Sequence, residues 1–530
     1  MASPAYDVLI IGGGHNGLTC AAYLARAGKK VKVLERRSVA GGAAVTEEFH
    51  PGFRNSVAAY TVSLLNPKVI RDLELARFGL KILERRMTNF WPRPDGGYFS
   101  FPVGAEALRH EFERVSKKDA DALPRYFRDI GLAADILREL VLQTPPNVGG
   151  GWREYLKAAR VGNRFRKLDL REEQLLLDLF TRSAAEFLDM YFESEQVKAA
   201  FAFDSIVGFF GSPFTPGTAY VLLHHAFGEV NGKKGVWGHP VGGMGAITQA
   251  MAKAAEAAGA EIALESPVRR VLVEKGKAVG VELENGAEIH SRAVAANVGP
   301  KLLYLKMVDE EDLPADFRAR MQHFSVGSGV FRMNVALSEL PHFTCLKDKT
   351  EIADFYTAGI ILGHSLDYLD RAYRDAREHG WSKEPIVEIL ISSALDDTLA
   401  PKGQHVASLF CQHFAYDLPG GRTWPVEREK CADLVIDTVT KYAPNFKKSV
   451  LGRQVLSPWD LEQKFGLIGG DIFHGRLSLD QMFSARPLLG YADYRSPIKG
   501  LYLCGAGAHP GGGVTGAPGN NAAREILRDL

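Results

Sequence analysis

The fold is decided by a stretch near the start of the chain, YDVLIIGGGHNGLTCAAYLARAGKKVKVLERR, which covers residues 6–37. It opens with an apolar, β-branched run, Tyr6 to Ile11, that predicts a buried parallel strand. Glycines in the spacing GxGxxG follow, and the alanine-rich residues 18–27 then predict a helix. A second predicted strand, 30–34, ends at an acid, Glu35. Strand, glycine turn, helix, strand and acid stand in the order of a dinucleotide-binding βαβ unit.

The glycine turn predicts a binding site for a pyrophosphate, because each glycine has a physical task. Gly12 allows the tight turn, Gly14 lets the backbone approach the ligand, and Gly17 lets the helix pack on the strand. The phosphates would lie at the helix N-terminus, where free N–H groups and the helix dipole favour negative charge. Glu35 suits an acid that binds ribose hydroxyls and repels the 2′-phosphate of NADP. The turn residues of this predicted site are Gly12, Gly14, His15, Asn16 and Gly17.

A second glycine-rich loop lies near the other end of the 530-residue chain. It reads GAGAHPGGGVTG from Gly505 to Gly516, after an apolar strand, 500–504, and before a helix that starts at about Pro518. Such a loop can aim backbone N–H groups at a polar ligand edge, and the helix dipole would stabilise the negative charge of a reduced flavin. Together the two halves point to FAD rather than to a nicotinamide nucleotide, and therefore to redox chemistry.

Three motifs in the chain resemble those of known flavoprotein families. The acid and arginine Glu35-Arg36, followed by the glycine pair Gly41-Gly42, resemble the FAD superfamily of amine oxidases, glutathione-reductase-like enzymes and phytoene desaturases. The loop GAGAHPGGGVTG resembles the signature of phytoene desaturase-related flavoproteins, which include carotenoid desaturases and isomerases, carotene ketolases and retinol saturases. The stretch SPWDLEQKFGLIGGDIFHGRLSLDQMFSARP, residues 457–487, looks most like the branch called pyridine nucleotide-disulphide oxidoreductase domain-containing protein 2 and the nearby ketolases. The chain has no CxxC, so the residues for disulphide chemistry are lacking.

The resemblance implies cofactor contacts beyond the first turn. The glycine pair lies near the diphosphate and ribityl chain, and Ala43 stands where many members have arginine. Val268 matches a residue that contacts adenine through its backbone, and Asn297 ends a stretch that lies under the dinucleotide. The FAD would be held without a covalent bond. Besides the turn and Glu35, the implied contacts are Arg36, Gly41, Gly42, Ala43, Val268, Asn297, Gly505, Ala506, Gly513, Val514 and Thr515.

The predicted fold class is α/β, with a Rossmann-type FAD-binding domain of the glutathione-reductase and amine-oxidase kind and an inserted α+β substrate domain. A middle segment carries a strong hairpin signal at Asn285-Gly286. The resemblance implies that this segment returns to the FAD-binding domain, which is therefore expected to be discontinuous. The glycines of PVGGMG, residues 240–245, are not expected to form a second nucleotide site, since their spacing is not GxGxxG. The predicted boundaries are 1–100, 236–305 and 455–530 for the FAD-binding domain, and 101–235 and 306–454 for the substrate domain.

Composition limits the classes of partner. Lysine plus arginine total 64 against 63 acids, a net charge of +1, so nothing favours nucleic acid. The five cysteines are scattered, which fits a reducing cytoplasm, and no metal-ligand cluster is evident. We expect a cytoplasmic protein with no signal peptide and no transmembrane helix. The Phe-rich stretch 199–214 is interpreted as core, with a lipid-facing entrance or a wall of a hydrophobic substrate tunnel as the alternative. Peripheral membrane contact and oligomeric state stay open.

The sequence offers few candidates for catalysis, because FAD supplies the hard step and the protein need only position a substrate and exclude water. His509 lies in the C-terminal loop and is either a polar contact near the flavin ring or part of the loop structure. Asp471 and His474 lie in GGDIFHGRLSLDQ and either line the substrate side, where they could donate protons, or only hold the loop. His50, Asn55, Ser56 and Tyr60 follow the glycine pair and are further candidates to approach the ring, whereas His224-His225 is interpreted as structural.

The prediction is an FAD-dependent oxidoreductase that acts on a hydrophobic small molecule, isoprenoid- or carotenoid-like or otherwise lipidic, by hydride transfer to or from flavin N5. One alternative is a flavoenzyme of the amine-oxidase type. The other is a non-catalytic FAD-binding protein that acts through partners. The family covers desaturation, saturation, isomerisation and ketolation on one fold, so the fold does not select among them.

Overall fold

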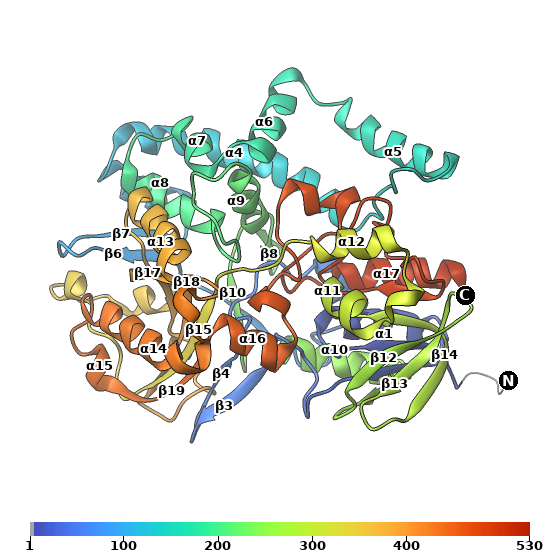
Figure 1. The fold of residues 1–530 in the computed structure, drawn as a ribbon. Coiled ribbons are helices and arrows are strands. Elements are labelled where there is room, and N and C mark those ends of the chain that lie inside the picture. Colours follow the sequence, from blue (N-terminus) through green and yellow to red (C-terminus); the bar gives the residue numbers. More distant parts are fainter. Residues whose placement is uncertain (1–4) are drawn as a thin grey trace.

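A computed structural model describes residues 5–530, apart from the side chains of Arg153 and Arg164. Two mixed sheets, each with helices packed against it, form two lobes, and a further group of helices covers one side of the molecule (Figure 1). The predicted α/β class is confirmed, and the arrangement of the two sheets positions the site described below.

The first sheet brings together segments from the start, the middle and the end of the chain. In spatial order its strands are β11 (Glu261–Ala263), β2 (Val31–Leu34), β1 (Tyr6–Ile11), β14 (Glu288–Ala296), β13 (Lys277–Leu283) and β12 (Val268–Glu274), with β20 (Leu501–Leu503) paired to β14. β1 runs parallel to β2 and to β14, and β20 also runs parallel to β14. The expected hairpin at Asn285-Gly286 joins β13 to β14.

Helices pack on this sheet, and this explains the unbroken apolar run of its central strand. The residues from Val8 to Ile10 have no exposed area, as expected for a parallel strand that is covered on both faces. α1 (His15–Arg26) packs against both α10 (Gly245–Ala257) and α17 (Ala517–Asp529). α1 begins at His15, earlier than the expected residue 18, because the last residues of the glycine turn already belong to the helix.

The second sheet is nearly all antiparallel. In spatial order its strands are β19 (Val450–Leu456), β15 (Phe331–Leu337), β18 (His405–Phe414), β17 (Trp381–Leu390), β16 (Gly359–Leu362), β6 (Met87–Pro92) and β7 (Tyr98–Pro102). Only the β16–β6 pair is parallel. The sheet is buried on both faces, so neighbouring residues of β18 face different cores. Phe410 packs with α13 (Leu366–His379), whereas Leu409 packs with α14 (Trp424–Thr440).

A layer of helices covers the face of the second sheet to which Phe410 belongs. Its members are α3 (Ala105–Glu113), α4 (Lys117–Val141), α6 (Leu170–Thr181), α7 (Ala184–Asp189), α8 (Glu195–Ala202) and α9 (Thr218–Ala226). α5 (Trp152–Phe165) lies apart from this layer (Figure 1). The Phe-rich stretch 199–214 runs from α8 towards α9, and most of its apolar side chains are buried. The stretch is therefore mostly core, as expected, although Val207 also lines the main cavity described below.

Shorter elements connect these layers. The strand pairs are β3 (Thr46–His50) with β4 (Phe53–Ser56), β5 (Ile82–Glu84) with β10 (Gly238–Pro240), and β8 (Glu229–Val230) with β9 (Lys233–Lys234). The remaining helices are α2 (Pro67–Asp72), α11 (Pro300–Leu302), α12 (Ala315–Gln322), α15 (Phe446–Ser449) and α16 (Pro458–Phe465). Across residues 5–530, no helix has both the length and the apolar character needed to span a bilayer.

Candidate functional site

A cavity of about 460 Å³ lies at the carboxyl ends of β1, β2 and β14. Ligands of open α/β sheets bind at this edge, where strand ends and loops present backbone groups. The cavity extends from Glu35 and Val268, on the side of the first sheet, to Phe410 of the second sheet. It is therefore enclosed jointly by both lobes, and each lobe contributes a different chemistry to its wall.

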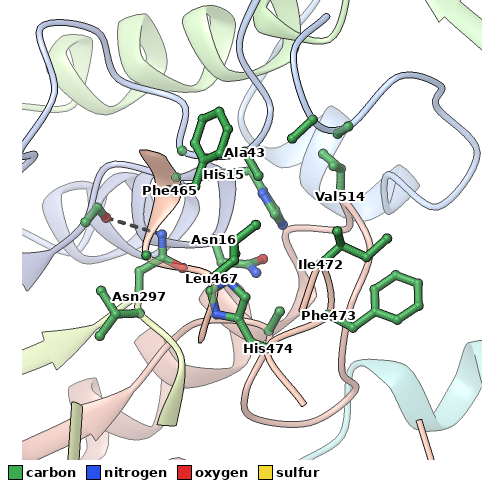
Figure 2. Close-up of a pocket in the computed structure, with 18 of the residues that line it drawn as sticks. His15, Asn16, Ala43, Asn297, Phe465, Leu467, Ile472, Phe473, His474 and Val514 are labelled. Atoms are coloured by element: carbon green, nitrogen blue, oxygen red, sulfur yellow. Dashed lines mark hydrogen bonds between the residues drawn. The ribbon is translucent and has the colours of Figure 1, made fainter. Parts of the chain in front are cut away.

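The glycine turn forms one end of the cavity and leaves no room for larger side chains. A Cβ at Gly14 would lie 2.8 Å from Asn297 Nδ2, and one at Gly17 would lie 2.3 Å from the carbonyl oxygen of Gly12. Asn297 Nδ2 donates to that same carbonyl over 3.2 Å, as the dashed line in Figure 2 marks. The end of β14 thus braces the turn that leads into α1.

Glu35 fixes the shape of the turn while it faces the cavity. Its carboxylate accepts from Gly13 N–H over 2.8 Å and from Arg37 N–H over 3.0 Å. Each carboxylate oxygen has a second lone pair, so the group can still accept from a hydroxyl of a ligand. Arg36 and Val268 line the same part of the cavity. This end offers a negative acceptor and apolar contacts, which suit a ribose and an adenine.

His15 joins the N-terminal turn to the C-terminal loop. Its Nε2 lies 3.1 Å from the carbonyl oxygen of Gly513, which can only accept, so Nε2 carries the proton. Burial lowers the pKa of His15 to about 4, so the ring is neutral at pH 7. The contact holds the two glycine-rich loops against each other across the cavity, where the sequence predicts the two halves of one cofactor site.

Several buried polar atoms that face this region lack a partner within the described chain. Asn16 Oδ1, His474 Nδ1 and Arg37 Nη1 are buried and make no hydrogen bond there. Asn16 and His474 lie on the same side of the cavity in Figure 2, and both line it. A buried polar group without a partner is costly, so these atoms indicate a polar ligand. The turn, the acid and the unpaired groups fit the diphosphate and ribityl parts of FAD.

A buried guanidinium organises the C-terminal half of the site. Arg486 has no exposed area, and its donors reach the carbonyl oxygens of Ala506 at 2.7 Å, Phe473 at 2.9 Å and Gln481 at 3.1 Å. Burial lowers the pKa of Arg486 to about 10, and the nearby Asp471 opposes this shift. Arg486 therefore ties the segment around Phe473 to the glycine loop that starts at Gly505.

The far end of the cavity is apolar. Phe410 lies stacked on Tyr60 with ring centroids 4.9 Å apart, and the Tyr60 hydroxyl donates to Glu388 over 2.5 Å, behind the cavity wall. Arg332 is fully buried behind the same two rings, 4.6 Å from the Tyr60 centroid. The apolar residues of this end are Val62, Leu64, Val207, Trp237, Phe410, Ile472 and Phe473.

Most of the cofactor residues predicted from the sequence lie together on the cavity wall. They are Gly12, Gly14, His15, Asn16, Glu35, Arg36, Gly42, Ala43, Val268, Asn297, Ala506, Gly513 and Val514. Four others do not line the cavity: Gly17, Gly41, Gly505 and Thr515. Gly41 N–H donates to the Gly13 carbonyl within the glycine turn, and Gly505 packs on Asn297, which does line the cavity. Direct contact with the cofactor stays a prediction for all the residues on both lists.

The three catalytic candidates occupy different places. His474 lines the main cavity, with a pKa lowered by burial to about 4. The buried Asp471 carboxylate accepts from Phe473 N–H over 2.7 Å and from Gly327 N–H over 2.8 Å, and so holds its own loop. His509 lines a separate cavity, and its Nε2 lies 3.0 Å from the Leu140 carbonyl oxygen.

Most of the wall that the second lobe contributes carries no signal in the sequence. Of the candidates that follow the glycine pair, Tyr60 lines the cavity, whereas His50, Asn55 and Ser56 do not. His225 lines it as well, which differs from the structural role expected for the pair His224-His225. Trp237 and Phe410 also line it without a sequence signal, whereas Val207 lies in the stretch 199–214, and Ile472 and Phe473 lie in GGDIFHGRLSLDQ. Only the pairing of distant strands and helices brings them to the cavity.

Comparison with known sequences agrees with this geometry. Residues 17–332 match the family described as flavin containing amine oxidoreductase. The chain is 41% identical to pyridine nucleotide-disulfide oxidoreductase domain-containing protein 2 of Rattus norvegicus, over 99% of this chain and 94% of that protein. It is 26% identical to one of the limonene dehydrogenase subunits of Castellaniella defragrans, over 99% and 95% of the two chains. It is 25% identical to the lycopene-forming phytoene desaturase of Pantoea ananas, over 98% and 99%.

A solved structure supports the fold independently of close sequence similarity. Cyclohexylamine oxidase from Brevibacterium oxydans superposes with a TM-score of 0.59 at 16% identity, over 99% of this chain and all of that chain. The resemblance inferred from the glycine motifs is confirmed by these sequence and structure comparisons together, and so are the predicted fold class and the FAD cofactor. The chain belongs to the family of flavin-containing amine oxidoreductases and is an FAD-dependent oxidoreductase.

Proposed function

We propose that the protein oxidises or reduces a carbon–carbon unit of a hydrophobic, isoprenoid-like or otherwise lipidic, substrate. When bound, FAD would supply the hydride chemistry at its N5. The observation that carries the proposal is the apolar wall opposite the cofactor turn, with Val207, Phe410 and Phe473 among its residues. Such a wall binds a hydrocarbon by removing apolar surface from water, and it keeps water from the reacting carbon.

Several polar groups near this wall are already engaged. The Tyr60 hydroxyl is bound to Glu388, and the Arg332 guanidinium donates to the Leu409 carbonyl over 2.8 Å and to Ser408 Oγ over 2.7 Å. Burial raises the pKa of Glu388, and the nearby Arg85 and Arg332 oppose this shift. These residues then act as a rigid backing for the cavity rather than as groups that transfer protons.

An amine substrate is a weaker candidate. Oxidation of an amine would call for a polar site in which aromatic rings enclose the amine. Tyr60 and Phe410 stack directly on each other with centroids 4.9 Å apart, which leaves no gap for a ligand between them. The names of two relatives, one from a limonene dehydrogenase and one a phytoene desaturase, point to isoprenoid hydrocarbons as the substrate class.

The test begins with the absorbance spectrum of the purified protein before and after acid precipitation. We expect flavin bands, and FAD in the supernatant, which would establish non-covalent attachment. The same sample is then titrated without oxygen, first with terpenoid and fatty lipids and then with a panel of amines. Bleaching by lipids supports the proposal, whereas bleaching and peroxide release with amines alone would replace it with the amine-oxidase function. Flavin that no cellular substrate or reductant bleaches would favour a non-catalytic protein.

A pair of variants at one wall position sharpens this test. Phe410→Glu places a charge in the apolar end of the cavity, and we expect it to abolish bleaching by the lipid while the flavin content stays normal. Phe410→Leu keeps the wall apolar and should retain most of the reaction. Equal rates for the two variants would show that the substrate does not use this wall.

A further inference from the structure

The helix α5 and the residues just before it expose several large apolar side chains. Val148, Trp152, Tyr155 and Leu156 are each between 49% and 72% exposed. Trp152, Tyr155 and Leu156 follow the spacing i, i+3, i+4, so they share one face of the helix. In Figure 1, α5 extends away from the body of the molecule at the upper right.

Positive charge surrounds the same face. Residues 152–167 contain six lysines and arginines and a single glutamate, in a chain whose net charge is only +1. The glutamate, Glu154, is turned inward, since it accepts from Asn147 N–H over 2.8 Å and from Lys157 Nζ over 2.6 Å. Arg160, Arg166 and Lys167 are exposed, and no ion pair of theirs occurs among the described residues.

The inner side of α5 covers a second, apolar cavity of about 200 Å³. Val161 and Phe165 of α5 form its outer wall, and His509 of the C-terminal glycine loop lies on its inner wall. Apart from two histidines, its lining is apolar or aromatic: Leu137, Leu140, Val141, Val161, Phe165, Phe180, Tyr220, Phe227, Met482, Phe483 and Pro510. A lipidic chain fits this lining better than a polar ligand does.

Only one layer of side chains separates the two cavities. His224 lines the second cavity, and its neighbour on α9, His225, lines the main cavity. The ring of His224 lies 5.7 Å, centroid to centroid, from the ring of Phe473, which lines the main cavity. An apolar path therefore runs from α5 to the wall of the main cavity, interrupted by these two rings.

We propose that residues 148–167 form a docking surface for an anionic lipid bilayer. Tryptophan and tyrosine prefer the boundary between water and lipid, leucine and valine enter the acyl region, and the flanking basic residues attract anionic headgroups. The inference goes beyond the proposed function, because docking needs no particular reaction. The second cavity as an entrance for a lipidic substrate rests on the proposed function.

Other occupants fit the surface less well. Self-association through this face would bring two clusters of positive charge together, which opposes binding. Nucleic acid would use the basic residues but would gain nothing from the exposed Leu156 and Val148. A bilayer with anionic headgroups uses both the apolar and the charged part of the surface, and a single helix lying in the plane of the membrane can bury them together.

The experiment measures partition of the full-length, FAD-loaded protein onto vesicles by co-sedimentation. Vesicles of phosphatidylcholine alone are compared with vesicles that also contain phosphatidylglycerol. We expect binding to the anionic vesicles to be about tenfold stronger and to decline as salt is added. Equal binding to both vesicle types, or no binding to either, would overturn the proposal.

Matched variants assign the binding to α5. Tyr155→Glu with Leu156→Glu removes the apolar face, and Arg160→Glu with Arg166→Glu reverses the charge, and each pair should weaken binding to anionic vesicles about tenfold. Val426→Glu, at a side chain that is 76% exposed on α14, is the control and should bind like the wild type. Wild-type binding by both α5 variants overturns the proposal. A loss of self-association in the α5 variants, with unchanged vesicle binding, would instead identify a second copy as the occupant.

Flavin absorbance of every variant separates this inference from the proposed function. Vesicle binding that is lost while the flavin band is retained locates the defect at the surface. Vesicle binding that persists in a protein whose flavin no lipid bleaches leaves the docking surface intact and removes the proposed function alone.

Discussion

Glu35 combines two tasks at the level of a single side chain. It is almost completely buried, and it holds the backbone of the turn through Gly13 and Arg37 while it faces the cavity. Because the charged carboxylate is the acceptor in all these contacts, its charge contributes both to the shape of the turn and to the binding of a ribose.

Glu35→Gln should therefore weaken FAD binding about 10- to 100-fold, since a hydrogen bond to a charged group contributes about 1.5–3 kcal/mol. The dissociation constant of FAD, measured by quenching of flavin fluorescence on addition to the apoprotein, tests this expectation. Glu48→Gln changes an exposed acid on β3 and should leave the constant unchanged. An unaltered constant for Glu35→Gln would exclude Glu35 from the site.

The residues that a sequence reveals are those whose role is local. Gly12, Gly14 and Glu35 could be predicted because a tight turn and an acid after the second strand are set by a short stretch of backbone. Phe410 could not, because its direction depends on the register of β18 against β15 and β17. A shift of one residue would place Leu409 at the cavity instead.

At the scale of the element, α1 and β1 meet at the glycine turn with no space to spare. Gly17→Ala would place a Cβ 2.3 Å from the Gly12 carbonyl oxygen, so helix and strand must move apart. We expect loss of FAD and a drop in stability of about 1–3 kcal/mol or more, as for other overpacked sites. Flavin content and urea unfolding measure the two effects.

Gly131→Ala in α4 is the matched control, because a Cβ there meets no atom within 4 Å. It should leave the flavin content unchanged and stabilise the protein by up to about 1 kcal/mol, since alanine favours a helix interior over glycine. Similar flavin loss in both variants would contradict the close packing of α1 on the turn.

Arg486 joins elements on the C-terminal side of the site, as the glycine turn joins α1 and β1 on the N-terminal side. Arg486→Lys keeps the charge but loses the planar set of donors that reaches Phe473, Gln481 and Ala506, and it leaves buried carbonyl groups unpaired. We expect destabilisation of about 3 kcal/mol or more and earlier release of flavin on heating. Thermal unfolding followed by flavin fluorescence and by tryptophan fluorescence tests this, with Arg320→Lys on the exposed side of α12 as the control.

The sequence alone does not show which apolar segments are buried and which are exposed. The stretch 199–214 is rich in phenylalanine, and composition alone could not decide between core and entrance. The exposed apolar face lies instead on α5, which carries more charge and fewer apolar residues. Exposure depends on which helices pack together, and that is decided by the whole layer of helices rather than by either segment.

At the scale of the whole molecule, several buried histidines couple stability to pH. Burial lowers the pKa of His509 to about 4, against 6.5 for a free side chain. The unfolded chain therefore binds a proton that the folded chain does not, so stability from this group is complete above pH 6.5 and is lost as the pH falls towards 4. Buried acids act in the opposite sense, since burial raises the pKa of Asp204 to about 7.

The buried histidines and the buried acids affect stability in opposite directions over overlapping pH ranges. The prediction therefore compares the stability of a His509 variant with that of the wild type. His509→Gln keeps a donor for the Leu140 carbonyl but cannot take up a proton. Relative to the wild type, the variant should gain up to about 3 kcal/mol of unfolding free energy between pH 6.5 and 4, at about 1.4 kcal/mol per pKa unit. Urea unfolding at several pH values measures the gain. Parallel stability curves would mean that His509 is already accessible to water.

The order of the strands in the first sheet has a consequence for how the protein is made. β1 is synthesised almost 500 residues before β20, yet both pair with β14. The loop that follows β20 supplies Ala506, Gly513 and Val514 to the cavity. A nascent chain that still lacks this segment has only half a flavin pocket, so cofactor capture must await its synthesis. Until then the edge of β14 that β20 later covers is unpaired and open to aggregation.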